Sequence, residues 1–392
     1  MIPLTTYFRI IVKTFAGLEP VLADEISTLG GQQIEPINRA VAFVGDKKLL
    51  YRANYELRTA LRVLVPIAQF NIKDENQLYD AIQQLNWHEY FDVDQTFAVD
   101  AVVGGSVFTH SQYVTHKTKD AIVDQFRNRF GNRPSINTLR PDLRVHIHIQ
   151  GNELNILLDS SGESLHKRGY RYQVDKAPIN EVLAAGLILL SGWKGDSNFV
   201  DAMCGSGTIP IEAVMIAMHI PAGYYRDRFG FMSWKDFDKS LWEEVWREAG
   251  EKMTDCSVKI LASDRSGRAV DIAKNNMQKA HVHKDILLLK KDMSVLIPPP
   301  APGIAIMNPP YGQRLEEKDL KQLYSGIGDS LKKQFTGYKA WIISSDIAAL
   351  KHVGLKPSKR ITVFNGPLEC RFVEYELFAG THKDHKTNVS TR

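Results

Sequence analysis

The sequence has few cysteines, no long apolar run and no internal repeat. Its three cysteines, Cys204, Cys256 and Cys370, are scattered and form no CxxC pair. This spacing argues against a disulfide framework and against a zinc site. The best apolar candidate for a membrane span, VLAAGLILL, is far shorter than the ~18 residues that a span requires. We therefore expect neither a bound metal nor a membrane anchor.

The N-terminus lacks the pattern of a secretory signal. MIPLTTYFRIIVKTF alternates apolar residues with Arg9 and Lys13, whereas a signal peptide has a basic leader followed by an uninterrupted apolar block. The segment is typical of a β-strand, and we expect cytoplasmic residence. Because 44% of the 392 residues are hydrophobic and 24% charged, disordered and fibrous classes are excluded. At about 150 residues per domain, this length predicts two or three domains.

The pattern of apolar residues divides the chain into two small α+β units and a larger α/β unit. In residues 1–60, the strand-like stretches YFRIIVKTF and AVAFVGD each precede a helical pattern. Residues 61–164 contain the strand TFAVDAVV, a helix from Ser111 to Phe130, and a hairpin in which LRVHIHIQ and LNILLDS flank a turn. Residues 383–392 are expected to form a flexible tail.

Basic residues gather in the second unit and in the segment that follows it. A solvated polar face is the common reason for such charges, and a net charge of +4 does not by itself indicate a nucleic-acid partner. Their concentration makes them candidates to contact RNA phosphates. The candidates are three residues of the Ser111–Phe130 helix and three of the segment LHKRGYR: Lys117, Lys119, Arg127, Lys167, Arg168 and Arg171.

From residue 165 strands alternate with helices, which predicts a mostly parallel sheet with helices on both faces. The predicted strands are SNFVDAM, VKILASD, ILLLKKD, GIAIMN and KAWIISSD, followed by a hairpin of KRITVFNG and CRFVEYELF. An insertion, residues 219–250, separates the first two strands and is rich in aromatic residues. These aromatic side chains could stack on unpaired bases or pack against the sheet.

The first three of these strands end in Asp201, Asp264 and Asp292, and the first leads into the glycine-rich turn CGSGT. No Lys-Ser/Thr pair follows the glycines, which excludes a P-loop. A single aspartate at such a position is usually a cap or turn residue. Three in succession converge on the carboxyl edge of one sheet, where Asp264 can bridge ribose hydroxyls and Asp292 can reach an adenine amino group.

The fourth strand ends in NPPYG. Two consecutive prolines prevent a helix or a central strand from continuing, so Asn308, Pro309, Pro310 and Tyr311 form a rigid loop at the same edge. The Asn308 side-chain oxygen and the Pro309 carbonyl can accept from an exocyclic amine and direct its lone pair toward a methyl donor. Tyr311 can stack on a base that has left its duplex. The alternative is a proline-rich turn with a chance asparagine.

Together, DAMCGSGT, SDRSG and NPPYG resemble the S-adenosylmethionine-dependent amino-methyltransferases, which have a seven-stranded Rossmann-like sheet. The resemblance implies that Asp264 holds the ribose of that cofactor and Asp292 its adenine. KAPINEVLAAGL resembles the helix that closes the methionine pocket, which nominates Asn180 and Glu181. The residues implied to surround the methionine part are Asp201, Cys204, Gly205, Ser206, Gly207 and Thr208. Relatives usually have a proline where this chain has Ala202-Met203.

The upstream half, with its basic α+β unit and SGESLHKRGYR, resembles the THUMP-containing RNA guanine-N2 methyltransferases of the bacterial large-subunit ribosomal RNA group, described as RlmL-like. The resemblance implies a ferredoxin-like domain (1–60), a THUMP RNA-binding domain (61–164) and a methyltransferase domain (165–382) that methylates guanine N2 in 23S ribosomal RNA. Some relatives carry a second methyltransferase. Because this chain stops at Arg392, we expect one methylation, performed by a monomer or weak dimer.

Other functions remain open at this point. A tRNA guanine-N2 methyltransferase is the nearest rival, a DNA adenine-N6 methyltransferase has the same loop, and an RNA-binding assembly factor with a silent pocket is the non-enzyme alternative. A cytosine-C5 mechanism needs a nucleophilic cysteine, and neither Cys204 nor Cys370 is well placed for it. His146 and His148 have no nearby carboxylate or cysteine, so we expect residues of a strand face rather than metal ligands.

Overall fold

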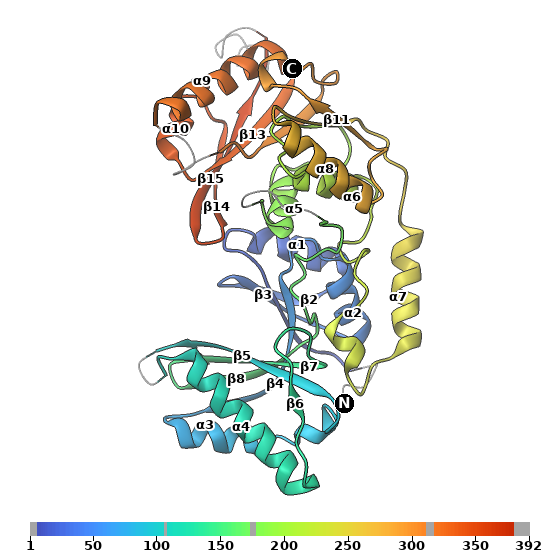
Figure 1. Ribbon diagram of the computed structural model, residues 1–392, viewed down its shortest axis with the longest axis vertical. Helices are drawn as coiled ribbons and strands as arrows, with labels where there is room; N and C mark the ends of the chain where they lie inside the picture. The colour runs from blue at the N-terminus through green and yellow to red at the C-terminus, as the bar shows by residue number, and fades with distance from the viewer. Residues whose placement is uncertain (1–5, 106–107, 173–177, 311–316, 380–392) are drawn as a thin grey trace. The chain divides into compact units, whose positions relative to one another are not determined.

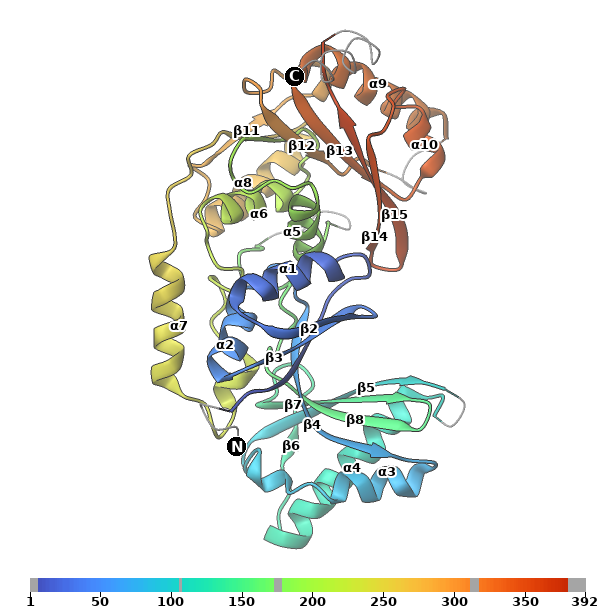
Figure 2. The same cartoon turned by 180° about the vertical axis from the view of Figure 1, so that it is seen from behind.

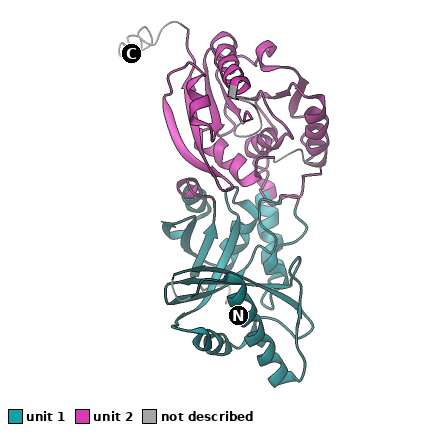
Figure 3. Ribbon diagram, turned by 60° about the vertical axis from the view of Figure 1, so that its left-hand side comes forward, with its two compact units in different colours: residues 1–14, 22–167, 226–249 teal, residues 15–21, 168–225, 250–392 magenta. Residues whose placement is uncertain are grey.

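A computed structural model of the chain describes residues 6–105, 108–172, 178–310 and 317–379. The chain separates into two compact units, shown in Figure 3. Unit 1 comprises Met1–Thr14, Leu22–Lys167 and Arg226–Ala249, and unit 2 comprises Phe15–Val21, Arg168–Tyr225 and Gly250–Arg392. The predicted tail, residues 383–392, and Tyr311 of the predicted active loop lie outside the described residues.

Unit 1 is built on a single eight-stranded sheet of order β2-β3-β1-β4-β8-β7-β5-β6. The sequence predicted two successive α+β units, and their strands join because β1 pairs antiparallel with both β3 and β4. The β7–β8 hairpin forms as predicted, with Gln150 opposite Glu153. The strands are β1 (Phe8–Lys13), β2 (Gln32–Ile37), β3 (Ala40–Gly45), β4 (Arg62–Asn71), β5 (Thr96–Gly104), β6 (Ser135–Ile136), β7 (Leu143–Gln150) and β8 (Glu153–Asp159).

Helices α3 and α4 cover one face of the β4-β8-β7-β5 part of this sheet, as Figures 1 and 2 show. The predicted Ser111–Phe130 helix is confirmed with those bounds, and its buried Ile122 and Phe126 face the sheet core. The helices that begin in this half of the chain are α1 (Glu19–Leu29), α2 (Lys47–Glu56), α3 (Glu75–Gln83), the short η1 (Trp87–Glu89) and α4 (Ser111–Phe130).

The aromatic insertion packs into the core of unit 1. It contributes η2 (Gly230–Ser233) and most of α7 (Lys239–Glu251). The rings of Phe231 and Tyr51 stack with their centroids 4.3 Å apart, and Phe229 is 1% exposed. Lys47 pairs with Asp236 across 3.1 Å. Packing, rather than a platform for unpaired bases, is therefore the role of these buried rings.

Unit 2 is a doubly wound α/β sheet of order β11-β10-β9-β12-β13-β15-β14, which confirms the predicted fold class. All seven predicted strands form. The first five are parallel, and β15 runs antiparallel to β13 and β14. The strands are β9 (Asn198–Asp201), β10 (Ile260–Asp264), β11 (Ile286–Lys290), β12 (Gly303–Met307), β13 (Tyr338–Ser344), β14 (Lys359–Asn365) and β15 (Leu368–Glu376).

Helices lie on both faces of this sheet. Figures 1 and 2 place α9 and α10 on one face and α5, α6 and α8 on the other. Their bounds are α5 (Glu181–Leu190), α6 (Thr208–Ala217), α8 (Gly267–Lys279), α9 (Glu317–Gln334) and α10 (Ile347–Lys351), and the short η3 (Met293–Val295) follows β11. In the part of the chain that the structure describes, none of the helices combines the length and apolar character needed to cross a membrane.

A short N-terminal segment belongs to unit 2. Leu18 is fully buried, and a Cβ on Gly186 of α5 would lie 2.6 Å from its Cδ1. Gly17 has a φ of +88°, and a Cβ there would lie 2.5 Å from the Thr362 carbonyl oxygen of β14. Glycine at both positions permits this close contact. Residues 15–21 are therefore part of the unit-2 core, although β1 immediately before them is in unit 1.

Candidate active site

Four polar residues meet at the carboxyl edge of the unit-2 sheet. Asp201 and Asp264 are the last residues of β9 and β10, Asp292 follows β11, and Asn308 follows β12 directly. Strand β9 lies between β10 and β12, so the residues at these ends are neighbours. This edge is where open α/β sheets bind ligands.

The glycine-rich turn after β9 is held in place by its neighbours. The Gly205 N–H donates to Asp264 Oδ2 at 3.0 Å, and the Cys204 N–H donates to the Ser263 carbonyl at 2.9 Å. Gly207 has a φ of +82°, and a Cβ there would lie 3.1 Å from that of Ala273 on α8. Gly205 has a φ of +51°, and a Cβ there would meet no atom within 4 Å. The turn is thus packed against α8 but leaves room for a ligand beside Gly205.

The side chains flanking the glycines are buried and uncharged at neutral pH. Ser206 and Thr208, which begin α6, are both buried. Burial raises the pKa of the Cys204 thiol well above its usual value, so this thiol stays protonated. A protonated, buried thiol is a poor nucleophile, which fits the structural role expected for Cys204.

Asp201 is buried and has an unusual pKa. Its Oδ1 accepts a hydrogen bond from the Met203 N–H at 3.1 Å, and the residue is 1% exposed. Burial raises the pKa of Asp201 to about 8, and the nearby Asp264 adds to this effect. The carboxyl group is therefore largely protonated at pH 7 and can donate as well as accept a hydrogen bond.

The pKa of Asp201 is higher in the folded than in the unfolded chain. Folding therefore costs free energy at any pH at which the unfolded chain has lost this proton, because the folded chain must take the proton up again or bury the charge. The penalty begins above the ordinary carboxyl pKa, grows as pH rises, and levels off above pH about 8. We expect Asp201→Asn, which cannot ionise, to gain stability relative to the wild type between pH 5 and pH 8. Urea unfolding at several pH values measures this difference, and a pH-independent difference contradicts the expectation.

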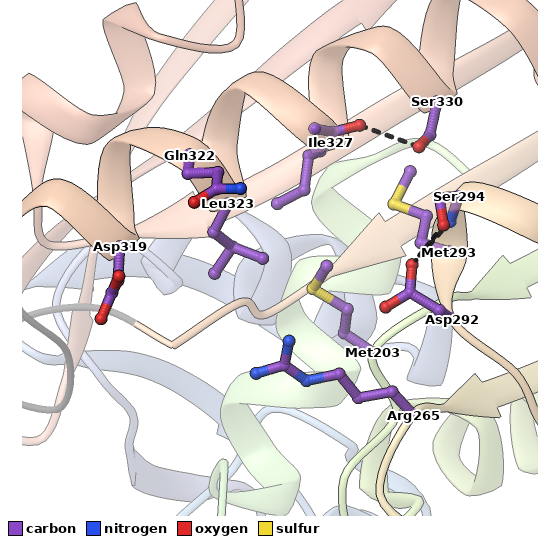
Figure 4. A pocket seen from close by; sticks show the side chains of 11 residues that line it. Met203, Arg265, Asp292, Met293, Ser294, Asp319, Gln322, Leu323, Ile327 and Ser330 are labelled. Atoms are coloured by element: carbon purple, nitrogen blue, oxygen red, sulfur yellow. Dashed lines mark hydrogen bonds between the residues drawn. The ribbon is translucent and has the colours of Figure 1, made fainter.

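Asp292 lies at the rim of a pocket of about 480 Å³. Its Oδ1 caps η3 by accepting from the Ser294 N–H at 2.9 Å and the Ser294 hydroxyl at 2.7 Å, and these hydrogen bonds lower the pKa of the carboxyl. Figure 4 shows Met203 and Arg265 across the pocket from residues of α9. The α9 residues in the lining are Asp319, Gln322, Leu323, Gly326, Ile327 and Ser330.

The sequence had missed this contribution of α9. The lining residues of that helix recur every three or four positions and so share one face. The same spacing is found in any amphipathic helix, so the pattern becomes informative only after the helix has been placed beside η3. Met203, which follows β9, also lines the pocket.

Asn308 presents a hydrogen-bond acceptor that has no partner in the part of the chain that the structure describes. Its side-chain Oδ1 is buried, and none of the described residues donates to it. Pro309 is also buried, as is every residue of β12. An acceptor left unpaired in a buried position costs about 1–3 kcal/mol, so such atoms commonly await a ligand. Asn308 therefore follows β12 directly and carries an oxygen suited to an N–H donor.

The residues nominated for the methionine pocket lie at the start of α5. Asn180 is the N-cap, and its Oδ1 accepts from the Val182 N–H at 2.9 Å. Glu181 Oε1 accepts from Arg171 Nε at 2.6 Å. The Nη2 of Arg171 also donates to the Thr208 hydroxyl at 3.1 Å. Arg171 thus connects the starts of α5 and α6. The sequence analysis had instead predicted that this residue contacts RNA.

Arg168 is not placed to contact RNA, contrary to the prediction. It is 1% exposed, and its Nε lies 3.3 Å from Oε1 of the fully buried Glu212 on α6. The Tyr170 hydroxyl donates to the same oxygen at 2.9 Å. The segment therefore anchors itself to the helix that follows the glycine turn. A partner 44 positions away leaves no signal in the local sequence.

The other predicted RNA contacts lie at the surface of unit 1. On α4, Lys119 pairs with Asp120 and Arg127 pairs with Asp124, while Lys117 lies over the ring of Tyr79. Lys167 remains exposed and pairs with Glu163 at 3.1 Å. Acidic neighbours reduce the positive charge that a count of basic residues suggests, but these four side chains are accessible.

Asn276 of α8 is a site residue that the sequence did not indicate. Its Nδ2 donates to the Ser206 carbonyl in the glycine turn at 3.0 Å, and its Oδ1 accepts from the Tyr172 N–H at 3.0 Å. One buried amide therefore holds the turn and the segment of Arg171 together. A polar residue in a helix is usually exposed, so only the fold reveals this function.

No cluster of side chains suited to a metal ion occurs among the described residues. Burial lowers the pKa of His146 to about 4 and also lowers that of His148. Both histidines lie on β7, each flanked by buried isoleucine or valine residues. They fit the expected role as residues of a strand face.

Comparison with protein families finds three matching descriptions along the chain. Residues 168–374 match an RMKL-like methyltransferase domain, residues 73–159 a THUMP domain, and residues 9–64 an RlmL ferredoxin-like domain. The first of these covers more than half of the chain.

Individual proteins share similarity over nearly the whole chain. The Synechocystis sp. protein slr0064, named as a candidate RNA methyltransferase, is 37% identical over 95% of this chain and 97% of its own length. The ribosomal RNA large subunit methyltransferase K/L of Syntrophotalea carbinolica is 36% identical over 93% of this chain, which spans only 54% of that protein. The crystal structure of SMU.472, a candidate methyltransferase in complex with SAH, superimposes with a TM-score of 0.85 at 29% identity, covering 96% of this chain and 100% of that one.

Proposed function

Since this chain belongs to the RMKL-like methyltransferase family and also carries THUMP and RlmL ferredoxin-like domains, we propose that it methylates N2 of a guanine in large-subunit ribosomal RNA. The family uses S-adenosylmethionine as its methyl donor. The observation that carries the proposal is the buried Asn308 Oδ1, which has no partner among the described residues and lies at the same sheet edge as Asp201 and Asp264. This oxygen is an acceptor for an amine, which is the group that a guanine presents at N2.

The residues at the sheet edge fit this cofactor. The Asp264 carboxylate accepts from the N–H groups of Gly205 and Ser266, and its remaining lone pairs can accept from ribose hydroxyls. Asp292 uses only Oδ1 for its helix cap, so Oδ2 can accept from an adenine amino group. The open space beside Gly205 allows the methionine part to approach the backbone.

The cofactor supplies an electrophilic methyl group on a sulfonium sulfur. On the protein side, Asn308 Oδ1 and the Pro309 carbonyl accept hydrogen bonds from the two N–H groups of the guanine amine. This geometry directs the nitrogen lone pair along the line of displacement. A new N–C bond forms as the S–C bond breaks, and the extra proton on nitrogen then passes to water. Tyr311 is proposed to stack on the flipped base, and no general base is required.

The choice of RNA rests on unit 1 and on the relatives. Lys117, Lys119, Arg127 and Lys167 are accessible basic residues suited to phosphates. Several relatives are named as large-subunit ribosomal RNA methyltransferases, which favours that RNA over tRNA or DNA. We further propose the domain limits 1–60, 61–164 and 165–382, cytoplasmic residence, and a monomer or weak dimer.

Methyl transfer to fractionated RNA tests the function. The chain is incubated with S-adenosylmethionine carrying a labelled methyl group, and with ribosomal RNA, tRNA or DNA from cells lacking this gene. Nucleosides from each fraction are then identified. We expect N2-methylguanosine in large-subunit ribosomal RNA. The same nucleoside only in tRNA would move the assignment to that substrate, N6-methyladenine in DNA would replace it, and no product in any fraction would favour a non-catalytic RNA-binding factor.

A separate prediction concerns the contribution of the accessible basic residues of α4 to RNA binding. Replacing Lys117, Lys119 and Arg127 together by alanine is expected to weaken RNA binding and to flatten its salt dependence. Each lost phosphate contact lowers the slope of log K against log[salt] by about 0.7–0.9. Because Lys119 and Arg127 have acidic neighbours, we expect a total change of roughly one to two. Filter binding between 50 and 200 mM salt measures it, and an unchanged slope means that α4 does not face the RNA.

A further inference from the structure

Strand β11 forms an unprotected edge of the unit-2 sheet. It is the last strand on one side, and among the described residues only β10 pairs with it (Figure 1). Its sequence, ILLLK, has four consecutive apolar residues. An edge strand presents a row of N–H and C=O groups that lack a strand partner, and an apolar edge readily pairs with a strand of another chain. β11 therefore has the features of a strand that recruits a further one.

The other sheet edges in the described chain carry features that discourage pairing. Strand β2 contains Pro36 and a shift of register, and β6 has only two residues. Strand β14 begins with Lys359 and Arg360, and a Cβ on Gly17 would lie 2.5 Å from its Thr362 carbonyl oxygen, so another segment covers this edge. Proline, charge, irregularity, shortness and cover are the usual protections of a sheet edge. β11 has none of them before Lys290.

Exposed apolar surface adjoins the β11 edge. Leu287 is 60% exposed, and Ile297 is 80% exposed. Leu287 and Pro299 line the same hollow of about 390 Å³, and Ile297 lies two residues before Pro299. Exposed apolar residues that gather in one place commonly mark a surface for association. A partner for this surface must supply a strand edge together with apolar side chains.

A second copy of β11 meets both requirements. Two copies related by a two-fold axis perpendicular to the sheet pair their edge strands antiparallel. Because hydrogen-bonded and non-hydrogen-bonded pairs alternate along such a ladder, the symmetry requires one residue to lie opposite its own copy. With Leu288 at that position, Leu287 lies opposite Leu289, and Asp285 lies opposite Lys291. Apolar side chains then meet at the centre, and opposite charges meet beyond both ends of the strand.

The neighbouring registers lack this match of charges. With Leu287 at the centre, Lys284 lies opposite Lys290, and like charges directly opposite each other are destabilising. With Leu289 at the centre, Lys290 lies opposite Leu288 and Lys291 opposite Leu287. Of the three registers, only the one centred on Leu288 pairs an acidic residue with a basic one.

We propose that β11 is a dimerisation strand, which pairs antiparallel with β11 of a second copy of this chain about Leu288. The pairing joins the unit-2 sheets of both copies into one continuous sheet and forms two ion pairs between Asp285 and Lys291. It gives a defined interface to the weak dimer named above. The proposal is independent of the proposed methylation, because it rests only on the edge of the sheet.

Sedimentation equilibrium of the full chain tests the dimer. Between about 1 µM and about 100 µM protein, we expect the apparent mass to rise from 44.3 kDa towards twice that value. Leu287→Lys places a charge within the apolar strip and should weaken association roughly 10-fold or more. Leu368→Lys is the matched control, since Leu368 is 50% exposed on β15 beside the opposite edge, and it should leave association unchanged.

An exchange of charges tests the register. Asp285→Lys and Lys291→Asp each place like charges opposite each other, so each variant alone should associate roughly 5- to 50-fold more weakly than the wild type. An equimolar mixture of the two variants restores opposite charges at both ends of the paired strands and should associate about as strongly as the wild type. The rescue also shows that both variants are folded.

Three results would overturn the proposal. The first is a wild-type chain that stays monomeric over the whole concentration range. The second is a dimer that Leu287→Lys does not weaken, since its interface then lies elsewhere. The third is a mixture of the two charge variants that associates no better than either alone, which refutes the pairing of Asp285 with Lys291. A wild-type dimer that methylates no RNA refutes the proposed function and leaves this interface intact.

Discussion

Replacing Asn308 by alanine is expected to slow methyl transfer about a hundredfold, with little change in the affinity for S-adenosylhomocysteine. The reason is that Asn308 Oδ1 is a buried acceptor to which none of the described residues donates, and we propose that it accepts from the reacting amine. Removing one preorganised polar group from a reacting centre typically lowers the rate by 10²–10³. Single-turnover methylation of RNA measures the chemical step, and calorimetry measures cofactor binding.

Asn308→Asp provides the matched control. It keeps the size of the side chain and an oxygen acceptor at the same place, so it should retain more activity than Asn308→Ala. Wild-type rates in the alanine variant would refute the role of Asn308 in orienting the amine. A parallel loss of cofactor affinity would instead indicate that the change has disturbed the whole sheet edge.

Replacing Arg168 by methionine is expected to destabilise the protein by about 3–5 kcal/mol, since the change leaves a charged Glu212 buried without its partner. Methionine nearly fills the volume of the arginine stem, so loss of packing contributes little. Denaturant unfolding of the variant and the wild type measures the difference. A change below about 1 kcal/mol would mean that Glu212 finds other compensation.

Two comparisons separate this effect from a general loss of charge. Lys167→Met removes a neighbouring positive charge that is 57% exposed, and it should change stability by less than about 0.5 kcal/mol. The double variant Arg168→Met with Glu212→Leu should recover part of the stability, because the buried charge is then absent altogether. No recovery in the double variant would place the cost in packing instead.

The strands of unit 2 and the residues at their ends could be predicted because both are local features. Each strand is a short apolar run, and the aspartate or asparagine that follows it is read directly from the sequence. The direction of parallel strands then brings these residues to one edge. Asp201, Asp264 and Asn308 needed no information beyond this pattern.

Other features depend on partners distant in sequence. β1 pairs with β4, where Lys13 lies opposite Arg62, so the two predicted N-terminal units share one sheet. The burial of Arg168 depends on Glu212, and the position of Arg171 depends on Thr208. In the sequence the three basic residues of HKRGYR look alike. Their charge does not reveal which of them will be buried in an ion pair with a glutamate far along the chain. The pocket face of α9 was hidden for the same reason.

The interleaving of the two units has a consequence for how the protein is made. Ribosomes release the chain from its N-terminus, and domains generally fold as their residues emerge. Unit 1 cannot complete its core when residue 167 appears, because Phe229, Phe231 and Trp234 are still to be synthesised. Leu18, in turn, cannot pack against Gly186 of α5 until that helix has been synthesised. We therefore expect both units to close late in translation, with the glycine turn and its helix already synthesised before the N-terminal unit is complete.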